Sequence, residues 1–594
     1  MRRSPMLALV LLVLLACEPM RAPMDATVDA GLDAPVADVR FDTRVDAGCT
    51  RVPGELVGER SIESGELPLL SWPGTEGAVA LRDHHEPCAP AGRVIVIREL
   101  TAWSAQSLWH VAHTAALVAM DDVVVIDLWA ADEDAMPMRT ERLDSVVARY
   151  DELPDAIASD PDEQLGAIAI GGIALPIVVV LDARTLHLER WFTDPRAGEI
   201  EDAVRATQAR LREQTRPPPF EPELLDGRFT RDRWEILEAM GAPYAPPPSS
   251  SNAHADDVAA AALGERLFED ASLSPSEVAC SSCHQEPRSF TDARVVGRGV
   301  EDVTRNTPTL IDAAGSRWQF WDGRADTLWA QALGPIENER EMASSRLFVA
   351  HRVASAYPAD YEAIFGALPP LADGARFPAE GAPGDAAWEA MRVADRDAVT
   401  RVFTNVGKAI EAYERTLVHT RGRFDRYASG ELDALSVAER DGLLAFFQGG
   451  CPQCHWGPRL ANDAFFAIDM PGVGEGALGD QGRIAAFDTL AASETRAQGA
   501  YSDDRTTPDP LDGLDAFPER MRGAFRTPTL RALGDSAPYG HAGTFMTLRS
   551  VVEHYARVRR PHTPDPRVIG VRDPHLIGFE DGRIASIVAF LEAL

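Results

Sequence analysis

The chain has 594 residues and a formal net charge of -34, and at about 150 residues per domain it should hold several domains. Its 45% hydrophobic content is that of a globular protein, which excludes wholesale disorder and a multi-span membrane protein. With 58 Lys and Arg against 92 Asp and Glu, it would repel phosphates, so a general nucleic-acid binder is excluded as well.

The first predicted element is an export signal. Arg2 and Arg3 precede an apolar run over residues 6–16, which is too short to span a bilayer comfortably. The run ends in Leu14-Leu15-Ala16-Cys17, which resembles the bacterial lipoprotein cleavage box. We therefore expect lipidation of Cys17 and an exported chain anchored to the cell envelope, at the outer membrane facing the periplasm. An ordinary secretory signal is the alternative.

Residues 18–48 have few aromatic side chains and a recurring aspartate, so they are predicted to form a flexible acidic tether. Cys49 and Cys88 belong to no other motif, and two leftover cysteines in an exported protein most simply pair with each other. Further along, Pro217-Pro218-Pro219 and Pro246-Pro247-Pro248 indicate a linker over residues 216–254.

Between tether and linker, residues 49–215 alternate between strand-like and helix-like segments. Continuous apolar runs, typical of strands covered on both faces, lie at 93–103, 123–129 and 177–181. Helical stretches are expected near 105–119 and 138–150. This alternation predicts an α/β domain.

The order of these segments resembles the thioredoxin-like fold. That family places a Cys-x-x-Cys directly after the residue that matches Trp103, where this chain has Ser104-Ala105-Gln106-Ser107, and a cis-proline at Leu175-Pro176. Disulfide exchange needs a thiolate, which serine cannot replace at neutral pH. The domain is therefore predicted to be redox-inert, a docking or packing module. A generic α/β domain of other ancestry is the alternative.

Two Cys-x-x-Cys-His motifs follow the linker. Thiols at this spacing can add to the two vinyl groups of one haem, and the adjacent histidine can then reach the iron. Zinc sites and redox pairs also use Cys-x-x-Cys, but a pair directly followed by His, twice, in an exported chain favours haem c. The sequence predicts two covalently bound haem c groups, attached at Cys280, Cys283, Cys451 and Cys454, with His284 and His455 on the irons.

The segments around these motifs show helix-like periodicity, with long loops between them. The expected helices cover 257–268, 345–356, 397–417, 437–448, 547–557 and 582–593. Residues 305–310 after the first motif and 525–531 after the second share the sequence Thr-Pro-Thr-Leu. We therefore expect two mainly α-helical cytochrome c-type domains, 255–425 and 426–594.

From residue 255 onward the chain resembles the bacterial di-haem cytochrome c peroxidases and the related MauG enzymes. The resemblance rests on ordered segments outside the haem motifs, which include Phe290-Thr291-Asp292, Phe320-Trp321-Asp322-Gly323-Arg324, Glu341-Met342 and Ala537-Pro538-Tyr539-Gly540-His541-Ala542-Gly543. It implies reduction of hydrogen peroxide at the N-terminal haem, with electrons relayed by the C-terminal haem from a small donor, a cytochrome c or a copper protein.

The resemblance also implies roles for individual residues. Glu341 matches the distal acid/base, whose task is to move a proton between the two peroxide oxygens. Gln331 matches a polar residue of the same pocket, and Trp321 matches the tryptophan between the haems. An inter-domain calcium ion is implied, bound by Asn306 and by backbone carbonyls near Ser536 and Pro538. A homodimer is compatible with the resemblance.

One departure from the family concerns the N-terminal iron. Many family members carry a removable histidine as its sixth ligand, but no histidine lies between His284 and Arg305. The peroxide site is therefore expected to be open without reductive activation.

The other departure concerns the C-terminal iron, where many members use methionine and this chain has Tyr555, as MauG-like enzymes do. Leu548, Val551, Val552 and Tyr555 are spaced to share one helix face. A tyrosinate ligand would lower the haem potential, whereas methionine raises it. His554, Met546 and no protein ligand are the alternatives.

Three functions follow from these expectations. The first is a di-haem peroxidase with an external electron donor, touching the membrane only through its lipid anchor. The second is a MauG-like oxidase that modifies a partner protein through high-valent haem, which Tyr555 favours. The third is a non-enzymatic electron carrier, against which Glu341 and the missing histidine argue, because a carrier prefers two saturated irons.

Overall fold

The structure is a computed structural model that describes residues 70–75, 77–86, 88–161, 165, 176–193, 195–212, 224–472, 480–557, 572 and 579–594. All described residues belong to the larger of two units, Thr50–Leu594. Cys17, the acidic tether, Cys49 and Leu175 lie outside the described residues. Within the described ranges no helix is both long enough and apolar enough to cross a membrane.

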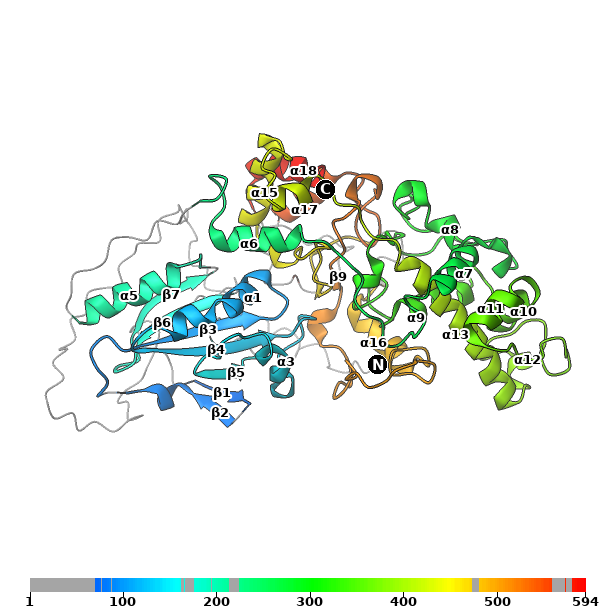
Figure 1. Cartoon of the computed structure of the whole chain (residues 1–594), viewed down its shortest axis with the longest axis horizontal. Coiled ribbons are helices and arrows are strands. Elements are labelled where there is room, and N and C mark those ends of the chain that lie inside the picture. The colour runs from blue at the N-terminus through cyan, green and yellow to red at the C-terminus, as the bar shows by residue number, and fades with distance from the viewer. Residues whose placement is uncertain are drawn as a thin grey trace, which may run out of the picture. The chain divides into compact units, whose positions relative to one another are not determined.

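A seven-stranded mixed sheet forms the first part of the larger unit (Figure 1), with strand order β2-β1-β5-β4-β3-β6-β7. Strands β3, β4 and β5 run parallel, β6 runs antiparallel to β3, and β7 runs antiparallel to β6. The strands are β1 Ser71–Gly74, β2 Gly77–Ala80, β3 Val94–Thr101, β4 Val123–Ala131, β5 Ala156–Ser159, β6 Ile177–Asp182 and β7 Leu188–Thr193. The three expected strands are confirmed as β3, β4 and β6.

The interior strand β3 is buried along its whole length, and its alternate residues enter two different cores. Val94 and Val96 pack with Ile200 and Val204 of helix α5 (Glu199–Leu211) on one face. The residues between them join Trp72 on the other face. This period of two explains why the run is apolar throughout. The remaining helices of this domain are α1 Ala105–Ala112, α2 Thr114–Val118 and α3 Leu143–Val147.

Part of the predicted linker is a helix. Helix α6 (Arg231–Met240) buries Ile236, Leu237 and Met240 in a core shared with the C-terminal helices. Prolines lie on both sides of this stretch, but its apolar residues at i, i+1 and i+4 give it an inward helical face. The linker prediction is wrong for these residues.

The second part of the unit is mainly helical, and the long α13 (Val393–Glu414) is its centre. Helix α7 (Val258–Glu269) packs directly against α13. The close approach requires glycine at position 264, because a Cβ atom there would collide with the Ala409 carbonyl. The remaining helices of this half are α8 Cys280–Cys283, α9 Leu328–Glu337, α10 Arg346–Ala356, α11 Pro358–Phe365, α12 Ala386–Glu389 and α14 Arg423–Ala428.

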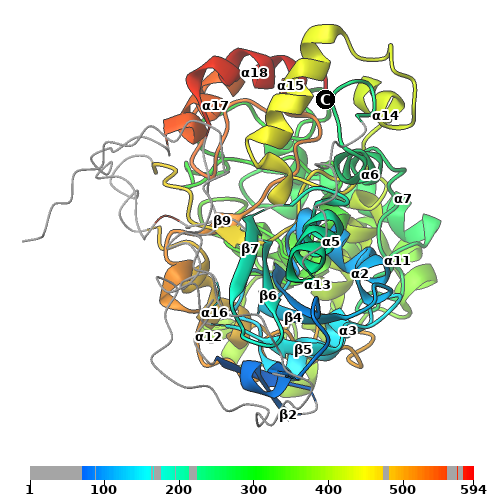
Figure 2. The same ribbon diagram turned by 90° about the vertical axis from the view of Figure 1, so that its left-hand side faces the viewer.

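In the C-terminal half, α15 (Val437–Gln448), α17 (Leu548–Arg557) and α18 (Ile584–Leu591) pack together (Figure 2). Phe446 of α15 and Phe590 of α18 meet edge to face, with ring centroids 5.3 Å apart. Helix α16 (Arg483–Ala492) and the two-stranded sheet β8 (Phe465–Phe466) and β9 (Phe525–Arg526) complete this half. All six expected helices are confirmed, with shifts of up to four residues at their ends.

Candidate functional site

Each of the two Cys-x-x-Cys-His motifs begins in one short helical turn. The first forms α8, and the second forms a single 3-10 turn over Cys451–Gln453. None of the four cysteines is in a disulfide. Burial raises the pKa of the Cys280 and Cys451 thiols to about 12, so neither is a reactive thiolate. Such thiols suit permanent attachment of a cofactor better than disulfide exchange.

Each motif histidine is held by a carbonyl that follows it in the chain. His284 Nδ1 lies 3.0 Å from the Phe290 carbonyl oxygen, and His455 Nδ1 lies 3.0 Å from that of Leu460. Burial lowers the pKa of both imidazoles, to about 4 for His455, so both are neutral. A neutral imidazole oriented through Nδ1 presents Nε2 to a metal, which is the arrangement of an axial haem ligand.

The two Thr-Pro-Thr-Leu segments support these motifs in the same way. The Thr309 hydroxyl donates to the Ser289 carbonyl at 2.5 Å, and the Thr529 hydroxyl donates to the Arg459 carbonyl at 2.6 Å. Both carbonyls belong to the loop just after the motif histidine. The sequence duplication therefore reflects a duplicated site.

A cavity of about 230 Å³ lies at the second motif, and its wall is mostly apolar. Cys451, Cys454 and His455 line it, as a haem attached there requires. Leu548, Val551, Val552 and Tyr555 of α17 also line it, so these four residues share the inward face that their spacing predicts. The donor set and the apolar wall both fit a c-type haem.

The other residues considered for the C-terminal iron differ in placement. His554 Nε2 lies 2.7 Å from the Ile468 carbonyl oxygen, and Met546 is 62% exposed. Neither lines the cavity, but Met470 does, and the sequence analysis did not single it out. Burial, followed by the neighbouring Cys454 and Cys451 thiols, raises the pKa of Tyr555 well above its usual range.

Glu341 lies near the first motif, just beyond the C-terminal end of α9. Asn338 Nδ2 donates to Glu341 Oε2 at 2.6 Å. Burial raises the pKa of Glu341, although Arg324 and Asn338 oppose the rise. The Cys283 thiol donates to the Arg298 carbonyl at 3.4 Å, and the next residue, Gly299, packs against the Glu341 backbone, so Glu341 lies close to the first attachment site.

Gln331 lies in the first turns of α9, and in the part of the chain that the structure describes no hydrogen bond joins it to Glu341. The backbone at Glu341 is fixed by a different residue. A side chain at Gly299 would collide with the Glu341 backbone, and the Val300 amide donates to the Glu341 carbonyl at 2.9 Å. Sequence reasoning missed Gly299, because its partner lies more than forty residues away in the chain.

Trp321 lies where the two halves meet. Its indole Nε1 donates to the Asn306 carbonyl at 2.9 Å, and both residues line the cavity of the second motif. The Asn306 side chain donates to the Arg294 carbonyl at 2.8 Å. Ser536 and Pro538 line the same cavity, but in the described ranges no three acidic, His or Cys side chains group as metal ligands. Calcium at Asn306 stays a prediction.

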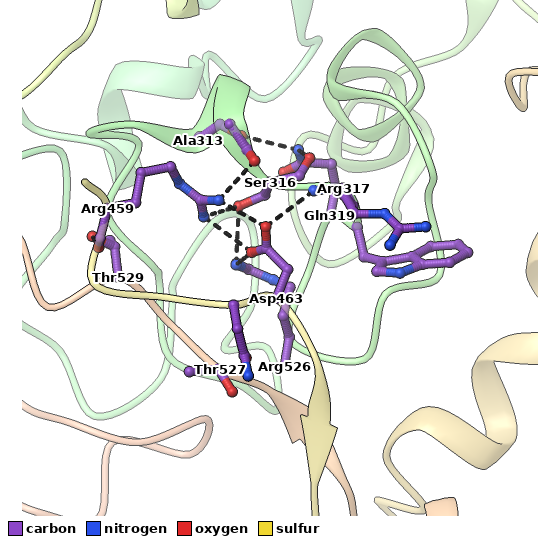
Figure 3. A network of polar contacts seen from close by, with 12 residues as sticks. Ala313, Ser316, Arg317, Gln319, Arg459, Asp463, Arg526, Thr527 and Thr529 are labelled. Carbon is purple, nitrogen blue, oxygen red and sulfur yellow. Dashed lines mark hydrogen bonds and ion pairs between the residues drawn. The ribbon is translucent and has the colours of Figure 1, made fainter. Parts of the chain in front are cut away.

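A buried polar network holds the loop before Trp321 against the C-terminal half (Figure 3). Asp463 accepts from Arg459 at 2.7 Å and from Arg526 at 3.0 Å, and both guanidiniums reach Ser316 Oγ. Burial alone would raise the pKa of Asp463, but Arg459 and Arg526 outweigh it and hold that pKa below its usual range. The single carboxylate of Asp463 thus neutralises two arginines, and all three side chains are buried or nearly so.

The fold and the site together define a c-type cytochrome enzyme with two attachment sites. The family model for di-haem cytochrome c peroxidase matches residues 258–433. The chain is 33% identical over 298 residues to the cytochrome c551 peroxidase of Pseudomonas aeruginosa, covering 49% of this chain and 69% of that one.

It is 30% identical over 339 residues to the methylamine utilization protein MauG of Methylorubrum extorquens, covering 56% of this chain and 77% of that one. The solved structure of a MauG-like protein associated with microbial copper homeostasis is 25% identical, with a TM-score of 0.42, and covers 59% of this chain and 93% of that one. The chain belongs to the di-haem cytochrome c peroxidase family, which also contains MauG, and the family implies two haem c groups.

Proposed function

We propose that this protein reduces hydrogen peroxide to water at its N-terminal haem, with electrons that reach it through the C-terminal haem from a small donor protein. The haem irons, when bound, supply the peroxide-binding centre and the redox capacity. Membership of the peroxidase family supports the reaction class. The observation that carries the proposal is the position of Glu341, a half-buried carboxyl group near the first attachment motif that is oriented by Asn338 and has a raised pKa.

Glu341 would take the proton from the near oxygen of peroxide and return it to the far oxygen, which then leaves as water. A carboxyl group with a raised pKa holds a proton more readily than an ordinary surface glutamate, which suits this shuttle. The Asn338 amide orients the carboxylate. The reaction consumes two electrons and two protons for each peroxide, and it yields two waters.

Electrons would pass between the halves through Trp321. Its indole Nε1 donates to the Asn306 carbonyl, and its backbone carbonyl accepts from the Arg526 amide, so both the side chain and the backbone of Trp321 are held in place. A rigid aromatic side chain at the cavity wall suits a relay, because electron transfer favours a fixed geometry between donor and acceptor.

The test is the stoichiometry of donor oxidation. The holoprotein, mixed with peroxide and a reduced cytochrome c or copper protein, should oxidise two one-electron donors for every peroxide consumed. A Cys451→Ser, Cys454→Ser variant, which cannot attach the second haem, should lose donor oxidation. Peroxide consumption without matching donor oxidation in the wild type would contradict the relay.

A second candidate is a MauG-like oxidase, and the position of Tyr555 in the wall of the C-terminal cavity favours it. Such an enzyme keeps the oxidising equivalents of peroxide until a partner protein arrives. Reduced donor added seconds after peroxide has been consumed would still be oxidised. If that delayed oxidation is absent, the simple peroxidase is the better description.

We also propose a calcium ion at Asn306, a thioredoxin-like origin for the sheet domain, and lipid anchoring at Cys17 of an exported chain. Cys88 is in a disulfide, which supports an oxidising compartment, and its expected partner Cys49 lies outside the described residues. Mass spectrometry of the mature protein would test the lipid and the disulfide together.

A further inference from the structure

The end of strand β3 in the sheet domain is closed to solvent. Trp103 is 2% exposed, and Thr101, Ser104 and Ser107 are 0% exposed. The Ser104 side chain caps α1 by accepting from the Ser107 amide at 3.4 Å. These four side chains are not available to an external partner, and residues of the haem-binding half contact Trp103.

The first covering contact is made by the loop of the second haem motif. The Trp103 carbonyl accepts from Trp456 Nε1 at 3.0 Å and from Asn462 Nδ2 at 3.1 Å. The Trp103 ring meets Phe466 edge to face, with centroids 5.1 Å apart. Cys454 packs against the same apolar cluster. The sheet domain therefore touches both the attachment cysteine and the residue next to His455.

The second contact is made by the loop that follows β4, the neighbour of β3 in the sheet. Asp134 Oδ1 accepts from Trp318 Nε1 at 2.6 Å, and its carboxylate pairs with Arg317 at 3.3 Å. Arg483 lies over the Trp318 ring at 4.0 Å and donates to the Gly323 carbonyl at 2.6 Å. The sheet domain thus also holds the loop that carries Trp321.

We propose that the sheet domain is an intramolecular cover for the C-terminal haem: Trp103 shields the haem-attachment loop from water and Asp134 anchors the loop of Trp321. The edge of the sheet at which thioredoxin-like proteins carry their Cys-x-x-Cys motif forms, in this chain, an interface with the haem-binding half. The inference rests on attachment of the second haem at Cys451 and Cys454, and it goes beyond the proposed peroxidase chemistry.

The cover has a defined physical effect. A haem surrounded by apolar protein disfavours the extra positive charge of ferric iron, whereas water stabilises that charge. Loosening the cover at Trp103 should therefore admit water near Cys454 and lower the midpoint potential of the C-terminal haem. Loosening it at Asp134 should free the Trp318–Trp321 loop without changing the haem ligands.

The first experiment is redox titration of the holoprotein. Trp103→Phe should shift the C-terminal haem to lower potential. Trp129→Phe is the matched control, because Trp129 is equally buried in the sheet but packs on Tyr150 inside the same domain. A potential equal to that of wild type in Trp103→Phe would overturn the proposal, and so would an equal shift in both variants.

The second experiment measures neither enzyme activity nor the midpoint potential of a haem. Hydrogen exchange of residues 316–324 should become several-fold faster in Asp134→Ala, whereas Asp83→Ala, an exposed site in the same domain, should leave it unchanged. Equal protection in all three proteins would overturn the proposal. Haem content, measured separately from alkaline pyridine spectra, distinguishes failure of the cover from failure of haem attachment and hence of the proposed function.

Discussion

The backbone carbonyl of Trp321 accepts a hydrogen bond from the backbone amide of Arg526 at 2.8 Å. The same arginine reaches the Phe320 carbonyl through Nε and Asp463 through Nη1. Arg526, in the second Thr-Pro segment, therefore holds the loop between the halves at Phe320 and Trp321, while Asp463 neutralises its guanidinium. The strength of that attachment depends on the carboxylate that neutralises the arginine.

We predict that Asp463→Asn destabilises the protein by about 3 kcal/mol, because it leaves two buried guanidiniums without a counter-charge. Thermal or denaturant unfolding of the holoprotein measures this loss. Asp433→Asn, at an exposed position, is the control and should match wild type. Equal stability of the two variants would mean that the network in Figure 3 does not hold the halves together.

A second prediction concerns Glu414, which is buried on α13 with one carboxylate oxygen that has no hydrogen-bond partner in the described structure. Burial, and then the charge of Glu411, raise its pKa to about 8. The folded state therefore binds this proton more tightly than the unfolded chain does. The resulting stability is complete below the unfolded pKa and is lost as pH rises through about 8.

Glu414→Gln should remove this pH dependence. At mildly alkaline pH the variant should be about 2–4 kcal/mol more stable than wild type, and in acid the two should be equal. Urea unfolding across that pH range measures the difference. Glu431→Gln, at an exposed position, should keep the wild-type profile. Parallel profiles for Glu414→Gln and wild type would show that Glu414 does not stay protonated.

The third prediction tests the proton carrier. Glu341→Gln keeps the shape of the side chain but cannot move a proton, so peroxide turnover should fall by roughly 10²-fold or more. Glu339→Gln, two residues away and exposed, should retain wild-type turnover. Visible spectra of the resting protein should be nearly the same in all three. Normal turnover in Glu341→Gln would refute the assigned role.

Local sequence patterns predicted the parts of this fold that are determined by residues close together in the chain. The helix that carries Tyr555 and the two haem motifs follow from spacing alone. The contact between Trp103 and Trp456 could not be predicted, because the two residues lie more than three hundred positions apart and neither carries a local signal for the other. For the same reason Met470 was missed: its loop has no periodicity, and only the structure places it in the cavity wall.

The fourth prediction uses this long-range contact. Ser104→Cys, Ser107→Cys restores the thiols of an exchange motif, but both positions are 0% exposed beneath the haem-binding half. The double variant and the wild type should therefore both stay at background in an insulin-reduction assay. Thiol titration with and without denaturant checks that the new cysteines are present and buried. Reductase activity in the folded variant would mean that this edge opens.

The last prediction decides between the two enzyme proposals and concerns Tyr555. If Tyr555 binds the C-terminal iron as tyrosinate, that haem is electron-rich and hard to reduce, which suits storage of oxidising equivalents. Tyr555→Met should then raise its midpoint potential by a large step, because axial-ligand identity is a principal determinant of haem potential. Redox titration with optical detection of the C-terminal haem measures the step.

Two matched variants separate ligation from packing at this wall. Tyr539 lines the same cavity, but its hydroxyl donates to the Leu533 carbonyl at 2.8 Å, so Tyr539→Leu changes the wall without offering or removing an iron ligand. It should move the potential far less than Tyr555→Met does. Met470→Leu tests the other residue at this wall: if its thioether binds the iron, the potential falls in this variant and Tyr555→Met has little effect. That outcome would favour the simple peroxidase, because a methionine-ligated haem is readily reduced by an external donor.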